Sequence, residues 1–155
     1  MELLTDKKSK MKVRDNRSSC PVSTCLEILG DQWSLVIIRD LFLELTTFTD
    51  FMNSPEKISS NILTDRVNKL QKYNLIEYKL HPNNRKIKQY YLTEPGIDLY
   101  PIIYDLIVWG NDYLDMEFHP TAVDWYQKNE SLERKHSTKN DIATYKDFKT
   151  KLLSQ

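Results

Sequence analysis

Residues 58–92 read ISSNILTDRVNKLQKYNLIEYKLHPNNRKIKQYYL, and this stretch decides the fold. In its first half Leu63, Val67 and Leu70 recur at helical spacing, and Ser59 precedes them where an N-terminal cap would stand. In its second half two β-rich runs, Leu75 to Leu80 and Ile87 to Leu92, flank a polar turn. The stretch therefore predicts a helix followed directly by a β-hairpin.

This stretch is also strongly basic, although the whole chain has a formal net charge of zero. Residues 57–92 contain two carboxylates, Asp65 and Glu77, against eight cations: Lys57, Arg66, Lys69, Lys72, Lys79, Arg85, Lys86 and Lys88. A local excess of positive charge suits a polyanion, and a helix followed by a hairpin is the shape of a winged helix-turn-helix on DNA.

Short helices are expected before this stretch. Pro21 to Gly30 has an amphipathic pattern, and residues 32–43 combine an apolar stripe with charged positions. Thr47 followed by Asp50 has the form of a capping box and opens a short third helix. The predicted fold class is mainly α with a small β-hairpin wing (α+β), a winged helix-turn-helix with additional dimerisation helices.

A long helix is expected from Thr93 through about Phe118. It carries more apolar residues than one small domain covers, which indicates a partner helix from a second copy of the chain. Residues 119–155 are expected to be a C-terminal helical extension, polar and mobile over 129–140 and helical from Ile142. Residues 1–18 are expected to be a flexible N-terminal arm, and residues 19–118 the winged helix-turn-helix with its dimerisation helix.

Composition restricts the compartment and the class of function. No apolar run approaches the roughly 20 residues that span a bilayer, and the charged N-terminus lacks a signal-peptide core, so we expect a cytoplasmic protein with no membrane segment. The chain has three scattered histidines and three glycines that form no phosphate loop, so an enzyme and a cofactor are not expected. Asp112, Asp115 and His119 could share a helix face and bind a metal, but a solvated acidic helix end is the preferred interpretation and no metal site is expected.

Six blocks of sequence between Cys20 and Leu114 together resemble the HxlR-type winged-helix transcription regulators, which are similar in shape to the multiple-antibiotic-resistance regulators. They are Cys20-Pro21, LGDQWSLVIIRDL from Leu29, FTDF from Phe48, ISSNILTDRVNKLQKYNLI from Ile58, YYLTEPG from Tyr90 and VWGNDYL from Val108. The resemblance implies a homodimer on double-stranded DNA with a palindromic operator. Pro95 and Asp65 depart from the family pattern; Asp65 repels phosphate unless it accepts a hydrogen bond from cytosine or pairs with Lys69.

Candidate DNA-binding residues lie on the fourth helix and the hairpin. They are Ser59, Ser60, Asn61, Thr64, Asp65, Arg66, Asn68, Lys69, Arg85, Lys86 and Lys88. The small polar residues stand at the end of the helix where major-groove readers meet base edges, and the hairpin cations can reach phosphate. The alternative is that these residues form only the solvated face and caps of an ordinary helix.

Candidate dimer-interface residues lie on the first helix and on the long helix. They are Val22, Leu26, Ile103, Leu106, Ile107, Trp109 and Tyr113. Trp33 and Trp109 are interpreted as packing residues, and their family positions imply core and interface roles respectively.

The two cysteines are expected to differ. Cys25 shares the apolar stripe of the first helix and is expected to be buried and inert. Cys20 precedes Pro21 at the positive end of that helix, near Arg14 and Arg17, which favours the thiolate, and it matches a cysteine that some relatives use to sense oxidants. Cys20 is thus a candidate redox sensor or simply a small cap residue, and an oxidant or small-molecule effector is possible.

The sequence therefore predicts a sequence-specific, homodimeric DNA-binding transcription regulator. A different class stays open, a winged-helix adaptor that binds only protein. Its basic face would be covered by an acidic partner, and duplex DNA would show no salt-dependent binding.

Overall fold

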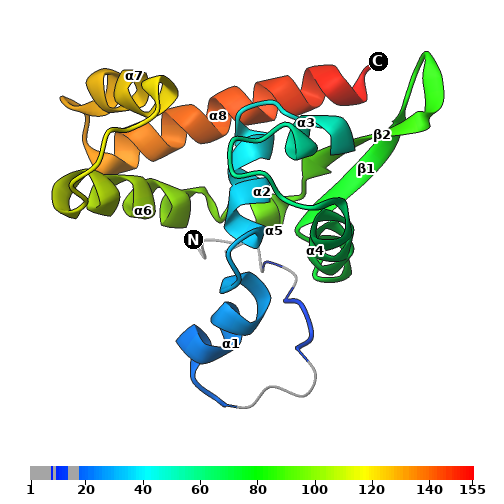
Figure 1. Cartoon of the computed structure of the whole chain (residues 1–155), viewed down its shortest axis with the longest axis horizontal. Coiled ribbons are helices and arrows are strands. Elements are labelled where there is room, and N and C mark those ends of the chain that lie inside the picture. The colour runs from blue at the N-terminus through cyan, green and yellow to red at the C-terminus, as the bar shows by residue number, and fades with distance from the viewer. Residues whose placement is uncertain (1–7, 9, 14–17) are drawn as a thin grey trace, which may run out of the picture.

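The computed structural model describes residue 8, residues 10–13 and residues 18–155. The expected N-terminal arm, residues 1–18, therefore lies largely outside the described residues, and so do Arg14 and Arg17. The elements follow one another as α1 (Pro21–Leu29), α2 (Ser34–Phe42), α3 (Phe48–Met52), α4 (Ser60–Lys72), β1 (Ile76–His81), β2 (Asn84–Leu92), α5 (Glu94–Ile97), α6 (Tyr100–Tyr113), α7 (Pro120–Asn129) and α8 (Arg134–Leu153) (Figure 1). This order confirms the predicted class, mainly helical with one antiparallel hairpin.

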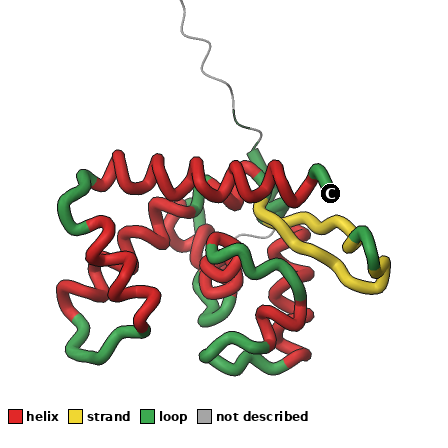
Figure 2. The backbone as a smooth tube through the Cα atoms, turned by 90° about the horizontal axis from the view of Figure 1, so that it is seen from above, coloured by secondary structure: helices red, strands yellow, loops and turns green. Residues whose placement is uncertain are grey.

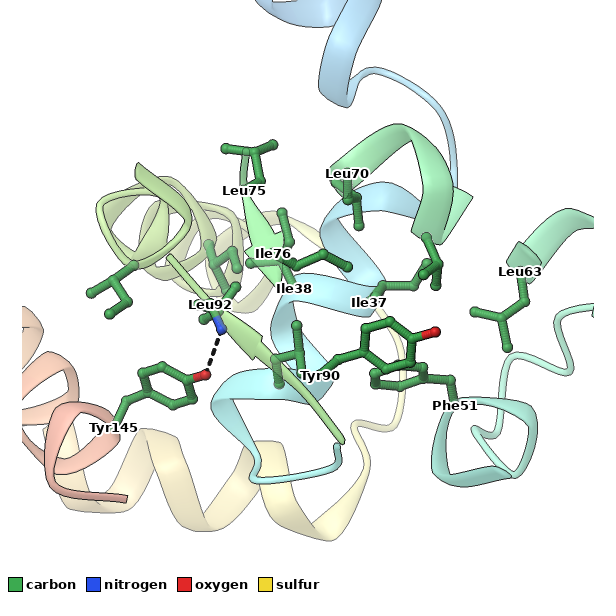
Figure 3. Close-up of a cluster of buried hydrophobic side chains, with 14 of the residues drawn as sticks. Ile37, Ile38, Phe51, Leu63, Leu70, Leu75, Ile76, Tyr90, Leu92 and Tyr145 are labelled. Carbon is green, nitrogen blue, oxygen red and sulfur yellow. Dashed lines mark hydrogen bonds between the residues drawn. The ribbon is translucent and has the colours of Figure 1, made fainter. Parts of the chain in front are cut away.

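Helix α2 forms the centre of the core. Ile37, Ile38 and Leu41 on this helix are almost completely buried, and α3 and α4 contribute Phe51 and Leu63 to the same cluster (Figure 3). Burying such side chains is the main favourable term in folding, about 1.5–3 kcal/mol for each one. The core therefore fixes α4 against α2 and α3.

The predicted caps of α3 and α4 are confirmed. Thr47 Oγ1 accepts from the amide of Asp50 at 3.2 Å, and Asp50 Oδ2 accepts from the amide of Thr47 at 2.8 Å, which completes a capping box. Ser59 Oγ accepts from the amide of Ile62 at 3.4 Å at the start of α4. Both helices therefore begin where the cap residues place them.

Helix α4 ends in a Schellman motif that turns the chain into the hairpin. Asn74 has φ 54°, and the amides of Asn74 and Leu75 donate to the carbonyl oxygens of Gln71 and Leu70, both at 2.9 Å. Asparagine tolerates this left-handed conformation better than most residues. The orientation of the hairpin relative to α4 is therefore set locally.

The hairpin pairs Ile76 with Leu92 and Tyr78 with Tyr90, and its turn lies between His81 and Asn84. The amide of Tyr90 donates to the carbonyl of Thr46 at 2.7 Å, which anchors β2 to the chain before α3. The base of the hairpin is buried, and its tip extends away from the body of the molecule (Figures 1 and 2).

The expected single helix from Thr93 to Phe118 is wrong, because the chain forms α5 and α6 instead. Pro101 stands in the first turn of α6. In a continuous helix Pro101 could not donate a backbone hydrogen bond to the carbonyl of Ile97, and its ring would clash with that carbonyl. Helix α6 also ends early, at Tyr113, because Leu114 is extended. Residues 115–118 therefore lie in a loop.

The C-terminal region is more helical than expected. Residues 134–140, expected to be polar and mobile, form the first turns of α8, where Ser137 and Thr138 are buried. The expected final helix from Ile142 is present as part of α8, which runs from α7 to the hairpin (Figures 1 and 2). Tyr145 of α8 accepts a hydrogen bond from the amide of Leu92 at 2.8 Å (Figure 3), and its ring packs on Phe42.

Among the residues described here, no helix combines the length and the apolar character needed to cross a bilayer.

Candidate nucleic-acid interface

The side of α4 that faces away from the core is polar. Leu63, Val67 and Leu70 point into the protein, whereas Ser60, Asn61, Thr64, Asp65 and Asn68 are exposed, as is the cap residue Ser59. The apolar period of α4 thus places the predicted readout residues together on one accessible surface. A polar helix surface of this kind fits the width of a major groove.

The first turns of α4 present hydrogen-bonding groups of two kinds. The hydroxyl of Thr64 donates to the carbonyl of Ser60 at 2.8 Å, so its oxygen is left to accept. The amide group of Asn61 makes no hydrogen bond to any residue that the structure describes, which leaves its donor and acceptor for a ligand. An asparagine amide can pair with an adenine edge through both groups.

Arg66 and Lys69 are held by Asp31, which lies in the loop before α2. Arg66 Nε donates to Asp31 Oδ1 at 2.9 Å, and Lys69 Nζ lies 3.3 Å from Asp31 Oδ2. The same carboxylate accepts the amides of Trp33 and Ser34, both at 2.9 Å. Asp31 therefore joins the start of α2 to the middle of α4.

The charge of Asp31 is stabilised by this arrangement. Burial alone would raise the pKa of Asp31, but the hydrogen bonds from Ser34 and Trp33 and the charge of Arg66 outweigh it and lower the pKa to about 2. Of the two roles considered for Asp65, the pair with Lys69 is not formed: Asp65 pairs with Arg66, its neighbour, and Lys69 pairs with Asp31. Asp31 contacts both cations because the loop before α2 lies against the middle of α4.

Asp31 is the residue that sequence reasoning missed. It stood inside the LGDQWSLVIIRDL block, and an aspartate two or three residues before a helix is a common capping signal. That signal indicates the bonds to Trp33 and Ser34, but the contacts with Arg66 and Lys69 depend on how α2 and α4 pack.

A second charged cluster fixes the loop between α3 and α4. Arg39 of α2 donates to Asp40 Oδ1 and to Glu56 Oε1, each at 2.6 Å. The hydrogen bonds from Arg39 lower the pKa of Glu56 to about 2, whereas burial raises the pKa of Asp40. Glu56 is three residues before Ser59, the cap of α4, so the contact with Arg39 fixes the loop that leads into α4.

The tip of the hairpin carries the remaining predicted cations. Arg85, Lys86 and Lys88 are exposed, and the amide of Lys86 donates to Asn84 Oδ1 at 3.1 Å in the turn. Lys88 Nζ lies 4.2 Å from the centre of the Tyr78 ring, which orients this side chain along the strand. None of these three forms an ion pair with a described residue, so their charges are available to an anion.

Helices α1 and α6 expose apolar side chains away from this interface, and α1 projects from the body of the molecule (Figure 1). The exposed fractions are 67% for Val22, 59% for Leu26, 53% for Leu106, 56% for Trp109 and 72% for Tyr113. Ile103 is predicted to lie in the dimer interface, but it is buried in the core of its own chain. Ile107 is only half-buried and packs against that core.

Both cysteines are exposed free thiols on α1 or at its cap. The expectation that Cys25 is buried is wrong, because the stripe that it shares with Val22 and Leu26 faces outward in the single chain. The possible metal face is also absent: α6 ends at Tyr113, and His119 caps α7, where Nδ1 accepts from Thr121. No group of metal ligands occurs among the residues described.

The family of this chain is shown by comparison with known proteins. The family model described as HxlR-like helix-turn-helix matches residues 28–118, well over half of the chain. The transcriptional regulator YdeP of Bacillus subtilis, which bears an HTH-type name and is itself uncharacterised, is 30% identical over 101 residues, covering 65% of this chain and 79% of YdeP.

Solved structures give the same result. The structure of PA1607 is 33% identical, with a TM-score of 0.61, and the match covers 67% of this chain and 73% of that one. The redox regulator HypR in its oxidised form has a TM-score of 0.56 at 24% identity, covering 63% of this chain and all of HypR, which supports the fold alone. Helix α4 with its hairpin lies within the matched residues, and the chain belongs to the HxlR-like helix-turn-helix family of transcriptional regulators.

Proposed function

We propose that this chain is a homodimeric regulator that binds double-stranded DNA in a sequence-specific manner. The observation that carries the proposal is that α4, with its exposed polar turns, leads directly into a hairpin whose cationic tip forms no ion pair with a described residue. The first fits a major groove and the second fits the neighbouring phosphates or minor groove.

The residues of the interface divide by their chemistry. Asn61 and Thr64, with Ser60 and Asn68, are uncharged and suited to base edges. Arg85, Lys86 and Lys88 neutralise phosphate regardless of sequence. Arg66 and Lys69 serve first to orient α4, because Asp31 already neutralises part of their charge.

Dimerisation is proposed from the apolar surfaces of α1 and α6. Exposed side chains as large as Leu26, Leu106 and Trp109 are stabilised by burial against a second copy. A two-fold dimer would present two α4 helices, so the operator is expected to be palindromic, with half-sites about 34–36 Å apart or a multiple of that. Regulation of transcription at such operators places the protein in the cytoplasm.

A response to oxidants is proposed for Cys20. Its thiol is exposed at the start of α1, the helix that carries Val22 and Leu26 of the proposed dimer surface. Oxidation to a sulfenic acid or a mixed disulfide would add bulk and polarity beside that surface. Such a change can alter the spacing of the two α4 helices.

The test measures binding of the full chain to the DNA upstream of its own and neighbouring genes. Fluorescence anisotropy at several salt concentrations reports the affinity. We expect one fragment to bind at least about 10³-fold more tightly than random duplex, with affinity that falls as salt rises. If no fragment shows salt-dependent binding, the result favours the alternative, a protein-interaction adaptor.

A further inference from the structure

A pocket of about 530 Å³ is lined mainly by residues of α6 and α7. These two helices lie at the end of the molecule opposite the hairpin (Figure 1). One of its walls, α7, lies beyond the residues that match the family model. Its volume falls in the range of small-molecule sites, roughly 300–1,000 Å³.

The walls of the pocket are aromatic rings set nearly at right angles. Tyr104 meets Trp125 at 70°, Trp125 meets Tyr126 at 77°, and Tyr126 meets Phe118 at 65°, with ring centres 5.2 to 5.7 Å apart. Each ring therefore packs edge to face on the next, and we call this set of four rings the aromatic box. All four residues line the pocket, so a ligand in the pocket would lie against them.

The box is held in place by hydrogen bonds from its outer edges. Trp125 Nε1 donates to Asp141 Oδ2 at 3.1 Å, and Tyr126 donates its hydroxyl proton to the carbonyl of Ile107 at 2.6 Å. Asn129 Nδ2 donates to the carbonyl of Trp125 at 2.8 Å. The indole N–H of Trp125 and the hydroxyl of Tyr126 are therefore already hydrogen-bonded within the protein, so these two side chains are ordered before a ligand binds.

The charges at the pocket are all negative. Asp112 and Glu130 line it, and its lining, which consists entirely of described residues, includes no Lys, Arg or His. Two other carboxylates of this region are neutralised, since Asp105 receives two hydrogen bonds of 2.7 Å from Arg134 and Asp141 lies 3.7 Å from Lys128. Asp112 and Glu130 have no such partner among the described residues.

The charge of Asp112 acts directly on the aromatic wall. The pKa of Tyr126 is raised by burial and, in addition, by the negative charge of Asp112. On the outside of the box, Arg134 lies 5.9 Å from the centre of the Tyr104 ring while it pairs with Asp105. Tyr104, Asp105 and Arg134 thus form, beside the pocket, the same combination of ring, carboxylate and cation.

We propose that this pocket binds an organic cation, an ammonium or related group attached to an apolar body. The ring faces attract the cation, Asp112 and Glu130 supply the opposite charge, and the apolar body of the ligand lies against the remaining wall. This site does not depend on DNA binding, so its test is independent of the proposed function.

The test uses three probes of similar size and different charge with the full chain: benzyltrimethylammonium, benzyl alcohol and phenylacetate. Binding is followed by NMR on the indole N–H signals of the three tryptophans, with Trp125 assigned from Trp125→Phe. We expect benzyltrimethylammonium to shift the Trp125 signal with a Kd on the order of 1 mM or tighter, and phenylacetate to leave it unchanged.

Two double variants then separate a local site from a general acidic field. Asp112→Asn with Glu130→Gln should weaken binding of benzyltrimethylammonium about tenfold and leave binding of benzyl alcohol unchanged. Asp124→Asn with Glu117→Gln removes the same charge from exposed positions outside the lining and should change neither. Equal losses in both variants, equal binding of cation and anion, or shifts at Trp109 in place of Trp125 would each overturn the proposal.

Discussion

Arg66 and Asp31 are 35 residues apart in sequence, and they form an ion pair in which Arg66 Nε donates to Asp31 Oδ1 at 2.9 Å. The same carboxylate accepts the amides of Trp33 and Ser34 at the start of α2. One side chain thus links the start of α2 to the proposed recognition helix, and removing it tests how much this link contributes to stability.

We expect Asp31→Asn to lower the free energy of unfolding at pH 7 by about 1–3 kcal/mol, because the partly buried cations of Arg66 and Lys69 lose their shared partner. Urea denaturation measures this change. Asp65→Asn is the matched control, since Asp65 also pairs with Arg66 but is 66% exposed, and it should cost less than about 1 kcal/mol. If the two variants lose the same free energy of unfolding, the loss comes from the charge of Arg66, which both variants leave with one carboxylate fewer, and not from the shared contacts of Asp31.

The stabilisation by Asp31 should depend on pH in a defined window. The pKa of Asp31 is about 2 in the folded chain against an ordinary value of 3.8, so the unfolded chain takes up the proton first as the pH falls. The difference in stability between wild type and Asp31→Asn is therefore full above about pH 4 and lost towards pH 2. A difference that stays constant across this window would contradict the assignment.

The hairpin tip should control the salt dependence of DNA binding. Replacing Arg85 and Lys86 by alanine removes two phosphate contacts, so binding to every duplex weakens and the slope of log affinity against log salt falls by up to about two units. Salt titrations on operator and random DNA measure this. A double variant that keeps the full slope would remove the hairpin from the interface.

The first turns of α4 should control specificity. Asn61→Ala or Thr64→Ala should leave the salt slope nearly unchanged and cost roughly 1–3 kcal/mol of discrimination between operator and random DNA, because a base-edge hydrogen bond is lost. The same titrations serve here, and the hairpin variant is the control. Equal losses on both duplexes would show that these side chains do not read bases.

The apolar surface of α6 should hold the dimer together. Trp109→Asp places a charge in the proposed interface and should give monomers or aggregates in sedimentation velocity. Leu153→Asp adds the same charge at an exposed leucine on α8 and should leave the wild-type state intact. If Trp109→Asp sediments as the wild type does, the interface lies elsewhere.

Oxidant sensing should reside in Cys20. Diamide or a quinone should change operator affinity of the wild type, Cys20→Ser should abolish the change, and Cys25→Ser, which removes the other exposed thiol, should retain it. Anisotropy measured before and after reduction with dithiothreitol reports reversibility. An equal response of both variants would exclude Cys20 as the sensor.

The sequence predicts α4 and its hairpin well because their signals are local. Ser59, the apolar period of Leu63, Val67 and Leu70, and the polar turn at the hairpin tip each act within a few residues. The capping box of Thr47 and Asp50 has the same origin. The family resemblance then supplied the arrangement of these parts, and the matched residues 28–118 support it.

Elsewhere the sequence was misleading because tertiary packing decides the outcome. An apolar stripe marks a face that is buried somewhere, which is why Ile103 packs in its own core while Cys25 and Leu26 face outward. The break between α5 and α6 was foreseeable from Pro101. The ion pair of Asp31 with Arg66, and the aromatic box between α6 and α7, bring together residues whose separation in sequence carries no pattern.

The hydroxyl of Tyr145 receives the amide of Leu92, and Tyr145 lies beyond the residues that define the family. A chain cut after Phe118 would leave this amide, at the buried base of the hairpin, without an acceptor, and it would uncover the ring of Phe42. Water can then take the place of the lost acceptor, so the cost is the net contribution of one hydrogen bond, about 0.5–1.5 kcal/mol, together with the lost apolar contacts of Tyr145. Helix α8 therefore belongs to the interior of this protein, and shortening the chain to the residues that match the family model would remove part of that interior.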